Sequence, residues 1–221
     1  MYFLTFDTSL DKTYITLFES KNALDTQIIE THDDKYHSAF LIQNLVTILK
    51  KHNLTVKNIE AIGVNIGPGS FTGIRACLTI ARVIAQQLEI PLVGVSSTEI
   101  LSQLNTSDKD TVVLMDARKG MCYFAKYSTT GDEIAEPHLE PLEDLDIDDN
   151  VAVISDKVMQ EFLEKKGISS ICYLDENKDL GRFLGNLTYK KLKNDKQYHW
   201  AKVKPLYLQK PSITVSKKNI I

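Results

Sequence analysis

The chain of 221 residues carries a formal net charge of −3, and 43% of its residues are hydrophobic while 25% are charged. This composition is typical of a globular protein with one or two domains, and it excludes disordered, coiled-coil and collagen-like chains. The apolar runs are far shorter than the roughly 20 residues of a membrane span, and the first residues lack the pattern of a signal peptide. The three cysteines stand far apart, so we expect a reducing, cytoplasmic location without disulfides or a zinc site.

The first half of the sequence predicts alternating strands and helices. Segments rich in β-branched and aromatic residues predict strands at 2–7, 13–19 and 24–30. Helical spacing of apolar residues then predicts a helix from His37 or Ser38 to about His52. A strand at 59–66, a Gly/Pro break, a helix at about 71–88 and a buried strand at 92–95 follow. This alternation is typical of an α/β lobe.

The second half repeats this order. A strand at 111–116 ends in Asp116, as the first strand ends in Asp7, and each is followed by a polar turn and a second strand. After an acidic insertion, the pattern predicts strands at 151–155 and 171–174 and helices at 156–166 and 178–193. The sequence therefore predicts two copies of one α/β unit, in residues 1–105 and 106–221.

The most specific segment is Gly-Pro-Gly-Ser-Phe-Thr-Gly-Ile-Arg at 67–75, between a predicted strand and a predicted helix. Ser70 is a natural N-cap, and free backbone N–H groups at a helix start can bind an anion. The segment is neither a Walker loop nor a GxGxxG fingerprint. Two interpretations stay open: a tight connection in which Gly73 lets the helix pack closely on the sheet, or a vestigial anion or interface nucleotide site. The residues of that site would be Asp7, Gly67, Gly69, Ser70, Thr72 and Gly73.

This segment resembles the signature of the TsaB (YeaZ) family. Four further stretches resemble family motifs in the same order, namely Asp7-Thr8-Ser9, His37-Ser38, Asp116-Ala-Arg-Lys-Gly120 and Pro205-Leu-Tyr-Leu208. The resemblance covers nearly the whole chain and implies an α/β, two-lobed actin/Hsp70/sugar-kinase-like (ASKHA) fold of duplicated ribonuclease-H-like units. The sequence departs from the family pattern at Ala39, where Glu is common, and at Met121-Cys122, where an acidic residue and Val are common.

The resemblance also implies a function in tRNA modification. A member of this family is the non-catalytic partner of TsaD, which holds the metal and transfers the threonylcarbamoyl group, and the ATPase TsaE joins the pair. We therefore expect a scaffold and activating subunit for the formation of N6-threonylcarbamoyladenosine at position 37 of tRNAs that read ANN codons. Such a subunit would form a homodimer when TsaD is absent, and it would meet tRNA indirectly.

The residues themselves offer little for catalysis. A metal site of the TsaD type needs paired histidines at helical spacing, but Leu41 stands four residues after His37, and His32 precedes the predicted helix. The turn after Asp7 has no glycine and no two glycines are adjacent, so the phosphate and adenosine sites of kinase-like relatives are missing. We expect no metal and no cofactor. Asp7 and Asp116 are expected to hold the turns that follow them, with a vestigial cation or phosphate site as the alternative.

The apolar residues of the two long predicted helices cover more than one helix face. A helix that is apolar over most of its circumference is buried on several sides, and one sheet face covers only part of it. Either the two helices bury each other, or they form an interface with TsaD or with a second copy, which the resemblance favours. The residues assigned to that interface are Ile74, Cys77, Leu78, Ala81, Ile84, Ala85, Leu41 and Leu45.

Two other classes of function remain as alternatives to the scaffold. The first is an enzyme, either an M22-like metallopeptidase or a small-molecule kinase of the same superfamily, although the isolated cysteines and Ser70 suggest no nucleophile. The second is an RNA-binding module, because nine lysines and one acid stand from Lys190 to the end. Nine acids and no Lys or Arg stand at 132–149. Such blocks of like charge are otherwise expected to be solvated segments.

Overall fold

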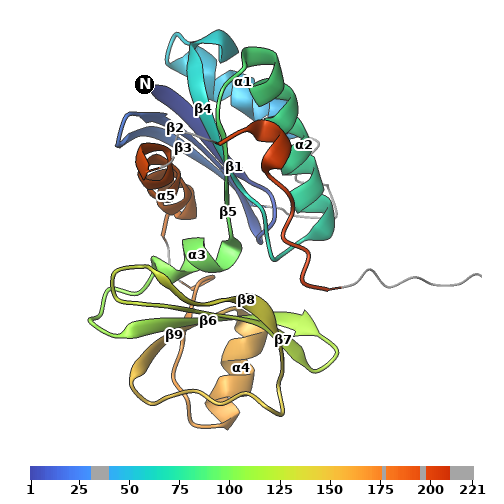
Figure 1. The fold of residues 1–221 in the computed structure, drawn as a ribbon, viewed down its shortest axis with the longest axis vertical. Helices are drawn as coiled ribbons and strands as arrows, with labels where there is room; N and C mark the ends of the chain where they lie inside the picture. Colours follow the sequence, from blue (N-terminus) through green and yellow to red (C-terminus); the bar gives the residue numbers. More distant parts are fainter. Residues whose placement is uncertain (31–39, 176–177, 195–197, 210–221) are drawn as a thin grey trace, which may run out of the picture.

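The computed structural model describes residues 1–30, 40–175, 178–194 and 198–209 (Figure 1). It consists of two five-stranded sheets that lie one above the other, with helices on their outer faces and between them. His32, His37, Ser38 and Ala39, which the sequence places at or before the start of the first helix, lie outside the described residues. Within the described ranges, none of the helices has the length and hydropathy that crossing a bilayer requires.

The first sheet has the strand order β3-β2-β1-β4-β5. Its strands are β1 (Tyr2–Asp7), β2 (Lys12–Glu19), β3 (Asn22–Glu30), β4 (Ile59–Asn65) and β5 (Leu92–Val95). Strands β1, β2 and β3 form an antiparallel meander, while β4 lies parallel to β1 and β5 lies parallel to β4. The predicted segments 2–7, 13–19, 24–30, 59–66 and 92–95 are therefore strands, with ends that differ by one or two residues.

The second sheet repeats this topology. Its order is β10-β9-β6-β7-β8, from strands β6 (Asp110–Arg118), β7 (Met121–Tyr127), β8 (Glu133–Pro141), β9 (Val151–Ser155) and β10 (Ile171–Cys172). Strands β6, β7 and β8 are antiparallel, and β9 and β10 continue the sheet in parallel. The same three-plus-two arrangement in both halves confirms the predicted duplication and the α/β fold of the actin/Hsp70/sugar-kinase-like class.

Helices cover both faces of the first sheet. Helices α1 (Leu41–Lys51) and α2 (Phe71–Leu88) lie on one side, and α5 (Leu180–Asn194) lies on the other (Figure 1). Because side chains alternate along a strand, Leu4 and Phe6 face the core under α1 and α2, whereas Phe3 stacks on Phe18 and Tyr189 under α5. Helix α5 comes from the second half of the chain, so the last part of the chain returns to the first sheet. The division at 105/106 stays a prediction.

One hydrophobic cluster lies between the two sheets. The short helix α3 (Ser97–Ser102) lies between them, and α4 (Lys157–Lys165) covers the outer face of the second sheet (Figure 1). One cluster joins Val95 of β5 and Leu101 of α3 to Val113 of β6 and Leu184 of α5. The elements that the structure describes also include the single-turn 3-10 helices η2 (Val56–Asn58) and η3 (Trp200–Lys202). The lobes therefore meet through packed apolar side chains.

The acidic segment 132–149 differs from the expectation of a solvated loop. Half of it forms the edge strand β8, which pairs with β7 from Met121↔Pro141 to Tyr127↔Glu133. An edge strand exposes one row of backbone groups and many side chains to water, so it tolerates the charges that suggested a loop. Helix α3 was also not predicted, because six residues are too few to show a periodic pattern.

Candidate functional site

The turn after β1 is held by the carboxylate of Asp7. The backbone N–H and the hydroxyl of Ser9 donate to Asp7 Oδ1 over 2.7 and 2.6 Å, and Asn65 Nδ2 donates to Asp7 Oδ2 over 2.9 Å. Asp7 is only 2% exposed, so these donors replace water around a buried charge. The predicted structural role of Asp7 is confirmed by these contacts.

Asn65 connects this turn to the glycine-rich segment and to α3. Its Oδ1 accepts hydrogen bonds from Gly67 N over 2.8 Å and from Ser97 Oγ over 3.0 Å, while its Nδ2 donates to Asp7. Sequence reasoning missed this residue. The signal was a polar residue at the end of a buried strand, the same position that Asp7 occupies in β1.

The glycine-rich segment lies directly on the turn after β1. Ser70 N donates to Ser9 O over 2.8 Å, and Thr8 Oγ1 donates to Gly73 O over 2.7 Å. A Cβ added to Gly69 would lie 2.5 Å from Ser9 O, and one added to Gly73 would lie 2.7 Å from the Thr8 carbonyl carbon. Both glycines are therefore required by close backbone approach.

These contacts favour the tight connection over the anion site. Ser70 Oγ caps α2 by accepting from Gly73 N over 3.2 Å, and Ser70 N is already used by Ser9. Two of the backbone donors that an anion would need are thus engaged within the chain. Thr72 was also assigned to the anion or nucleotide site. Its side chain is exposed, and it takes no part in the contacts given above. The vestigial site stays a prediction.

The second lobe repeats the turn contact. Asp116 Oδ1 accepts from Arg118 N over 2.8 Å, which matches the Asp7–Ser9 contact in the first lobe. Asp156 caps α4 by accepting from Met159 N over 2.8 Å, and its other oxygen accepts from Asp116 N. Burial raises the pKa of the Asp156 carboxyl above its ordinary value. The predicted structural role of Asp116 is confirmed.

The cysteines are buried as expected. Cys77 Sγ donates to Phe6 O over 3.1 Å, and burial raises its pKa well above the ordinary value of a thiol. Burial also raises the pKa of Cys122 to about 12. Both thiols are therefore protonated at neutral pH and are poor nucleophiles. Across the part of the chain that the structure describes, no group of three or more His, Cys, Asp or Glu side chains is arranged to hold a metal ion.

The residues assigned to the partner interface lie mostly inside the chain. Seven of them are buried at 4% exposure or less, namely Ile74, Cys77, Leu78, Ala81, Ala85, Leu41 and Leu45, and all but Ile74 belong to the core cluster of the first sheet. Ile84 is partly buried at the edge of the same core. These side chains are used inside the chain, so the exposed side chains of α1 and α2 are the ones open to a partner. The assignment of these residues to a partner interface stays a prediction.

The opposite faces of the same two helices expose several large apolar side chains among polar ones. Ile42 is 60% exposed and Val46 is 44% exposed on α1, while Val83 is 56% exposed and Phe71 is 46% exposed on α2. A shallow groove of about 460 Å³ follows the outward face of α2. It is lined by Phe71, Thr72, Arg75, Ala76, Thr79 and Ile80. We call this surface of α1 and α2 the outer helical face.

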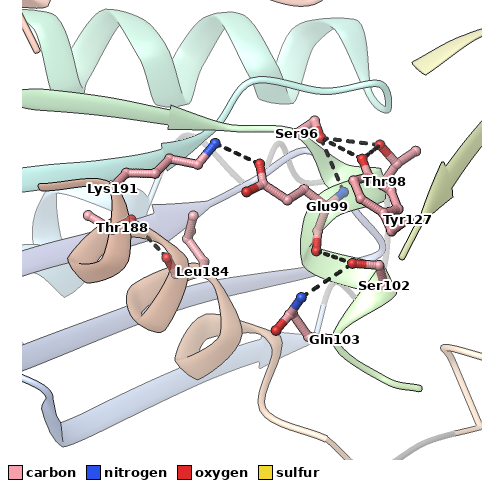
Figure 2. Close-up of polar contacts among 9 residues, drawn as sticks. All are labelled: Ser96, Thr98, Glu99, Ser102, Gln103, Tyr127, Leu184, Thr188 and Lys191. Carbon is pink, nitrogen blue, oxygen red and sulfur yellow. Dashed lines mark hydrogen bonds and ion pairs between the residues drawn. The ribbon is translucent and has the colours of Figure 1, made fainter. Parts of the chain in front are cut away.

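A polar cluster holds α3 between the two lobes (Figure 2). Thr98 Oγ1 and Tyr127 OH lie 2.8 Å apart, which joins α3 to the second sheet. Lys191 Nζ lies 2.7 Å from Glu99 Oε2, which joins α3 to α5. Burial raises the pKa of Tyr127 to about 12, so its hydroxyl remains a donor at neutral pH. A polar cavity of about 550 Å³ lies beside this cluster.

The comparisons with known proteins agree on one protein family. A family model described as TsaD, tRNA N6-adenosine threonylcarbamoyltransferase, matches residues 28–177, more than half of the chain. The TsaB protein of Bacillus subtilis is 35% identical over 107 residues, which are 47% of this chain and 46% of that protein. The TsaB protein of Buchnera aphidicola from Schizaphis graminum is 28% identical over 127 residues, which are 56% of this chain and 59% of that protein. The chain belongs to the TsaB/YeaZ family.

The family assignment agrees with the fold. The structure of YeaZ from Pseudomonas aeruginosa superimposes with a TM-score of 0.77 at 20% identity, covering 94% of this chain and 99% of that one. A second Pseudomonas aeruginosa structure, described as similar to peptidase YeaZ, gives a TM-score of 0.76 at 18% identity, covering 94% of this chain and 99% of that one. In sequence, the chain spans about half the length of the curated relatives it matches. The resemblance to the TsaB/YeaZ family is therefore confirmed.

Proposed function

We propose that the chain is the non-catalytic, activating subunit in the formation of N6-threonylcarbamoyladenosine at position 37 of tRNAs that read ANN codons. It would bind a TsaD transferase through the outer helical face, recruit TsaE to the pair, and contact tRNA only indirectly. In the absence of TsaD, the same face would pair two copies of the chain. The observation that carries the proposal is the exposed apolar face of α1 and α2 in a member of the TsaB/YeaZ family.

The chemistry of the outer helical face supports a protein partner. Ile42 and Val46 lie one turn apart on α1, and Val83 lies on α2 with its side chain more than half exposed. Contiguous apolar side chains on the surface of a folded protein are typical of interaction sites. The small residues Ala76 and Thr79 leave a groove between larger side chains, which permits close approach of a second helix.

The polar residues that were candidates for catalysis or anion binding hold the fold together. Asp7, Asn65 and the glycine-rich segment form a closed set of hydrogen bonds, and Asp116 holds the corresponding turn of the second lobe. Each of these groups supports the position of α2 or of the neighbouring strands. This arrangement supports a subunit whose task is to present α2 in a fixed orientation.

The experiment is a binding measurement with matched variants. The chain is mixed with the TsaD transferase of the same organism, and the mass of the complex is measured by size-exclusion chromatography with light scattering. Val83→Asp places a charge on the outer helical face, whereas Val158→Asp does so on α4 of the other lobe, where Val158 is 57% exposed. We expect one-to-one complexes for the native chain and Val158→Asp, and free subunits for Val83→Asp.

Two outcomes would overturn the proposal. The first is a native chain that forms no complex with the transferase at micromolar concentration. The second is equal binding by the two charge variants, which would place the interface elsewhere. Adding TsaE to the native complex should produce a larger, three-component species.

A further inference from the structure

Three side chains form an exposed cluster at the N-terminal end of α2. The Arg75 guanidinium carbon lies 3.8 Å from the centre of the Phe71 ring and 5.7 Å from the centre of the Tyr207 ring. Arg75 Nε donates to Tyr207 OH over 2.8 Å, and the two rings lie 5.1 Å apart. Phe71 is 46% exposed and Tyr207 is 44% exposed. The cluster therefore fixes an arginine between two aromatic rings at the surface.

The C-terminal segment (residues 203–209) supplies one of these three side chains. It runs along α2 toward the second lobe, in red in Figure 1. Its backbone is held at two places, where Arg82 of α2 donates to Val203 O and Leu206 N donates to Ile66 O over 2.8 Å, and the Gln209 side chain donates to Ala117 O. Tyr207 is thus held against α2 by contacts on both sides of it in the sequence.

The charge of the outer helical face is of one sign. Helix α2 contains two arginines and no acidic residue, and α1 contains two lysines and no acidic residue. Arg82 is turned toward the C-terminal segment, so Arg75 is the charged side chain that lines the groove of α2. Within the described ranges, no carboxylate pairs with Arg75. A carboxylate on a partner that covers this groove would complement the charge of Arg75.

We propose that Phe71, Arg75 and Tyr207 form the centre of the docking site, and that Arg75 pairs with a carboxylate on the TsaD partner. This inference rests on the proposed function and adds to it. It makes the C-terminal segment part of the docking site, although that segment follows α2 by more than 100 residues in the sequence. The partner surface is an apolar one that carries at least one Asp or Glu side chain opposite Arg75.

The physical basis is preorganisation. Arginine, tyrosine and tryptophan dominate the energetic centres of protein interfaces, and a side chain that is already ordered loses less entropy when it binds. The planar guanidinium can stack on two rings while its terminal nitrogens remain free to donate to a carboxylate. The groove beside the cluster gives the partner an apolar surface that surrounds the ion pair. Exclusion of water from such a pair strengthens it.

The test uses single substitutions in the full chain and measures the Kd of the complex with the transferase. Arg75→Gln and Tyr207→Ala should each weaken binding roughly 30-fold, the size expected for a central interface residue. Arg182→Gln on α5 is the matched control, because Arg182 is also exposed but lies on the opposite side of the first sheet. It should bind as the native chain does. Urea unfolding of each variant checks that the fold is retained.

Salt dependence separates charge from packing. The Kd of the native chain should rise with salt concentration because an ion pair is screened. Arg75→Gln should remove most of this dependence, whereas Tyr207→Ala should keep it. Removing residues 210–221 should leave binding unchanged, and removing residues 205–221 should weaken it as Tyr207→Ala does.

The outcomes distinguish this inference from the proposed function. If the native chain binds the transferase and Arg75→Gln and Tyr207→Ala bind equally well, the cluster is not the centre of the docking site. If Arg75→Gln weakens binding but the salt dependence stays the same, the partner provides no carboxylate. If the native chain does not bind at all, the proposed function itself fails.

Discussion

Replacement of Gly73 by alanine tests whether the glycine-rich segment must lie on the turn after β1. The new Cβ would stand 2.7 Å from the Thr8 carbonyl carbon and still closer to the Thr8 carbonyl oxygen. Ordinary contact needs about 3.6 Å with a carbon atom, and the carbonyl oxygen stands closer still, so α2 or the turn must move by more than about 1 Å. That movement stretches the bonds Thr8 Oγ1–Gly73 O and Ser70 N–Ser9 O, which are 2.7 and 2.8 Å long.

The expected cost follows from these contacts. Each of the two hydrogen bonds contributes about 1 kcal/mol, and overpacking against rigid backbone costs about 2 kcal/mol more. The higher helix propensity of alanine returns at most about 1 kcal/mol. We therefore expect Gly73→Ala to lower the free energy of unfolding by about 3 kcal/mol, whereas Thr72→Ala, at an exposed neighbouring position, should change it by less than about 0.5 kcal/mol.

Urea unfolding followed by the fluorescence of Trp200 measures both variants. Trp200 is the single tryptophan of the chain and packs partly buried against the core that α2 belongs to. A Gly73→Ala variant that is as stable as the native chain, or more stable, would show that the added Cβ does not collide with the turn. The close approach of α2 to Thr8 would then be refuted.

Three further predictions concern buried polar groups and thiols. Asp7→Asn replaces an acceptor with a donor facing Asn65 or Ser9, so we expect a loss of about 2 kcal/mol in unfolding free energy by urea titration. Tyr127→Phe removes the hydroxyl that meets Thr98 and should cost about 1 kcal/mol in the same assay; no change would contradict the bond. The three buried thiols should react with a thiol reagent at pH 8 only after unfolding, and rapid labelling of the folded chain would contradict their burial.

Strands and long helices could be predicted because their signals are local. The strand β1 and the helix α2 have the predicted bounds, since β-branched and aromatic runs or apolar residues at helical spacing are visible within single segments. The edge strand β8 could not be predicted, because it depends on pairing with β7 and its own sequence is acidic and contains two prolines. The position of α5 on the first sheet is equally a property of the assembled chain.

The sequence predicted which motifs form the candidate site, but it did not predict which side chains are exposed on the surface. The sequence indicated that Asp7 and the glycine-rich segment matter, but it could not show that Asn65 joins them across β4. An apolar residue on a helix indicates burial, but it does not indicate which surface buries it. Leu78 and Ala81 were therefore assigned to a partner, although they pack on the first sheet. The exposed face carries other apolar side chains, such as Ile42 and Val83. Helical periodicity alone does not distinguish these exposed residues from core residues.

The proposed function is to activate a transferase without performing the transfer itself. Its most direct test is the rate of threonylcarbamoyl transfer to tRNA by the TsaD transferase, measured with TsaE present while this chain is titrated. We expect a rate that rises with added chain and saturates at one chain per transferase, with Val158→Asp equal to the native chain and Val83→Asp inactive. A rate that is independent of this chain, or product formed by this chain without the transferase, would contradict it.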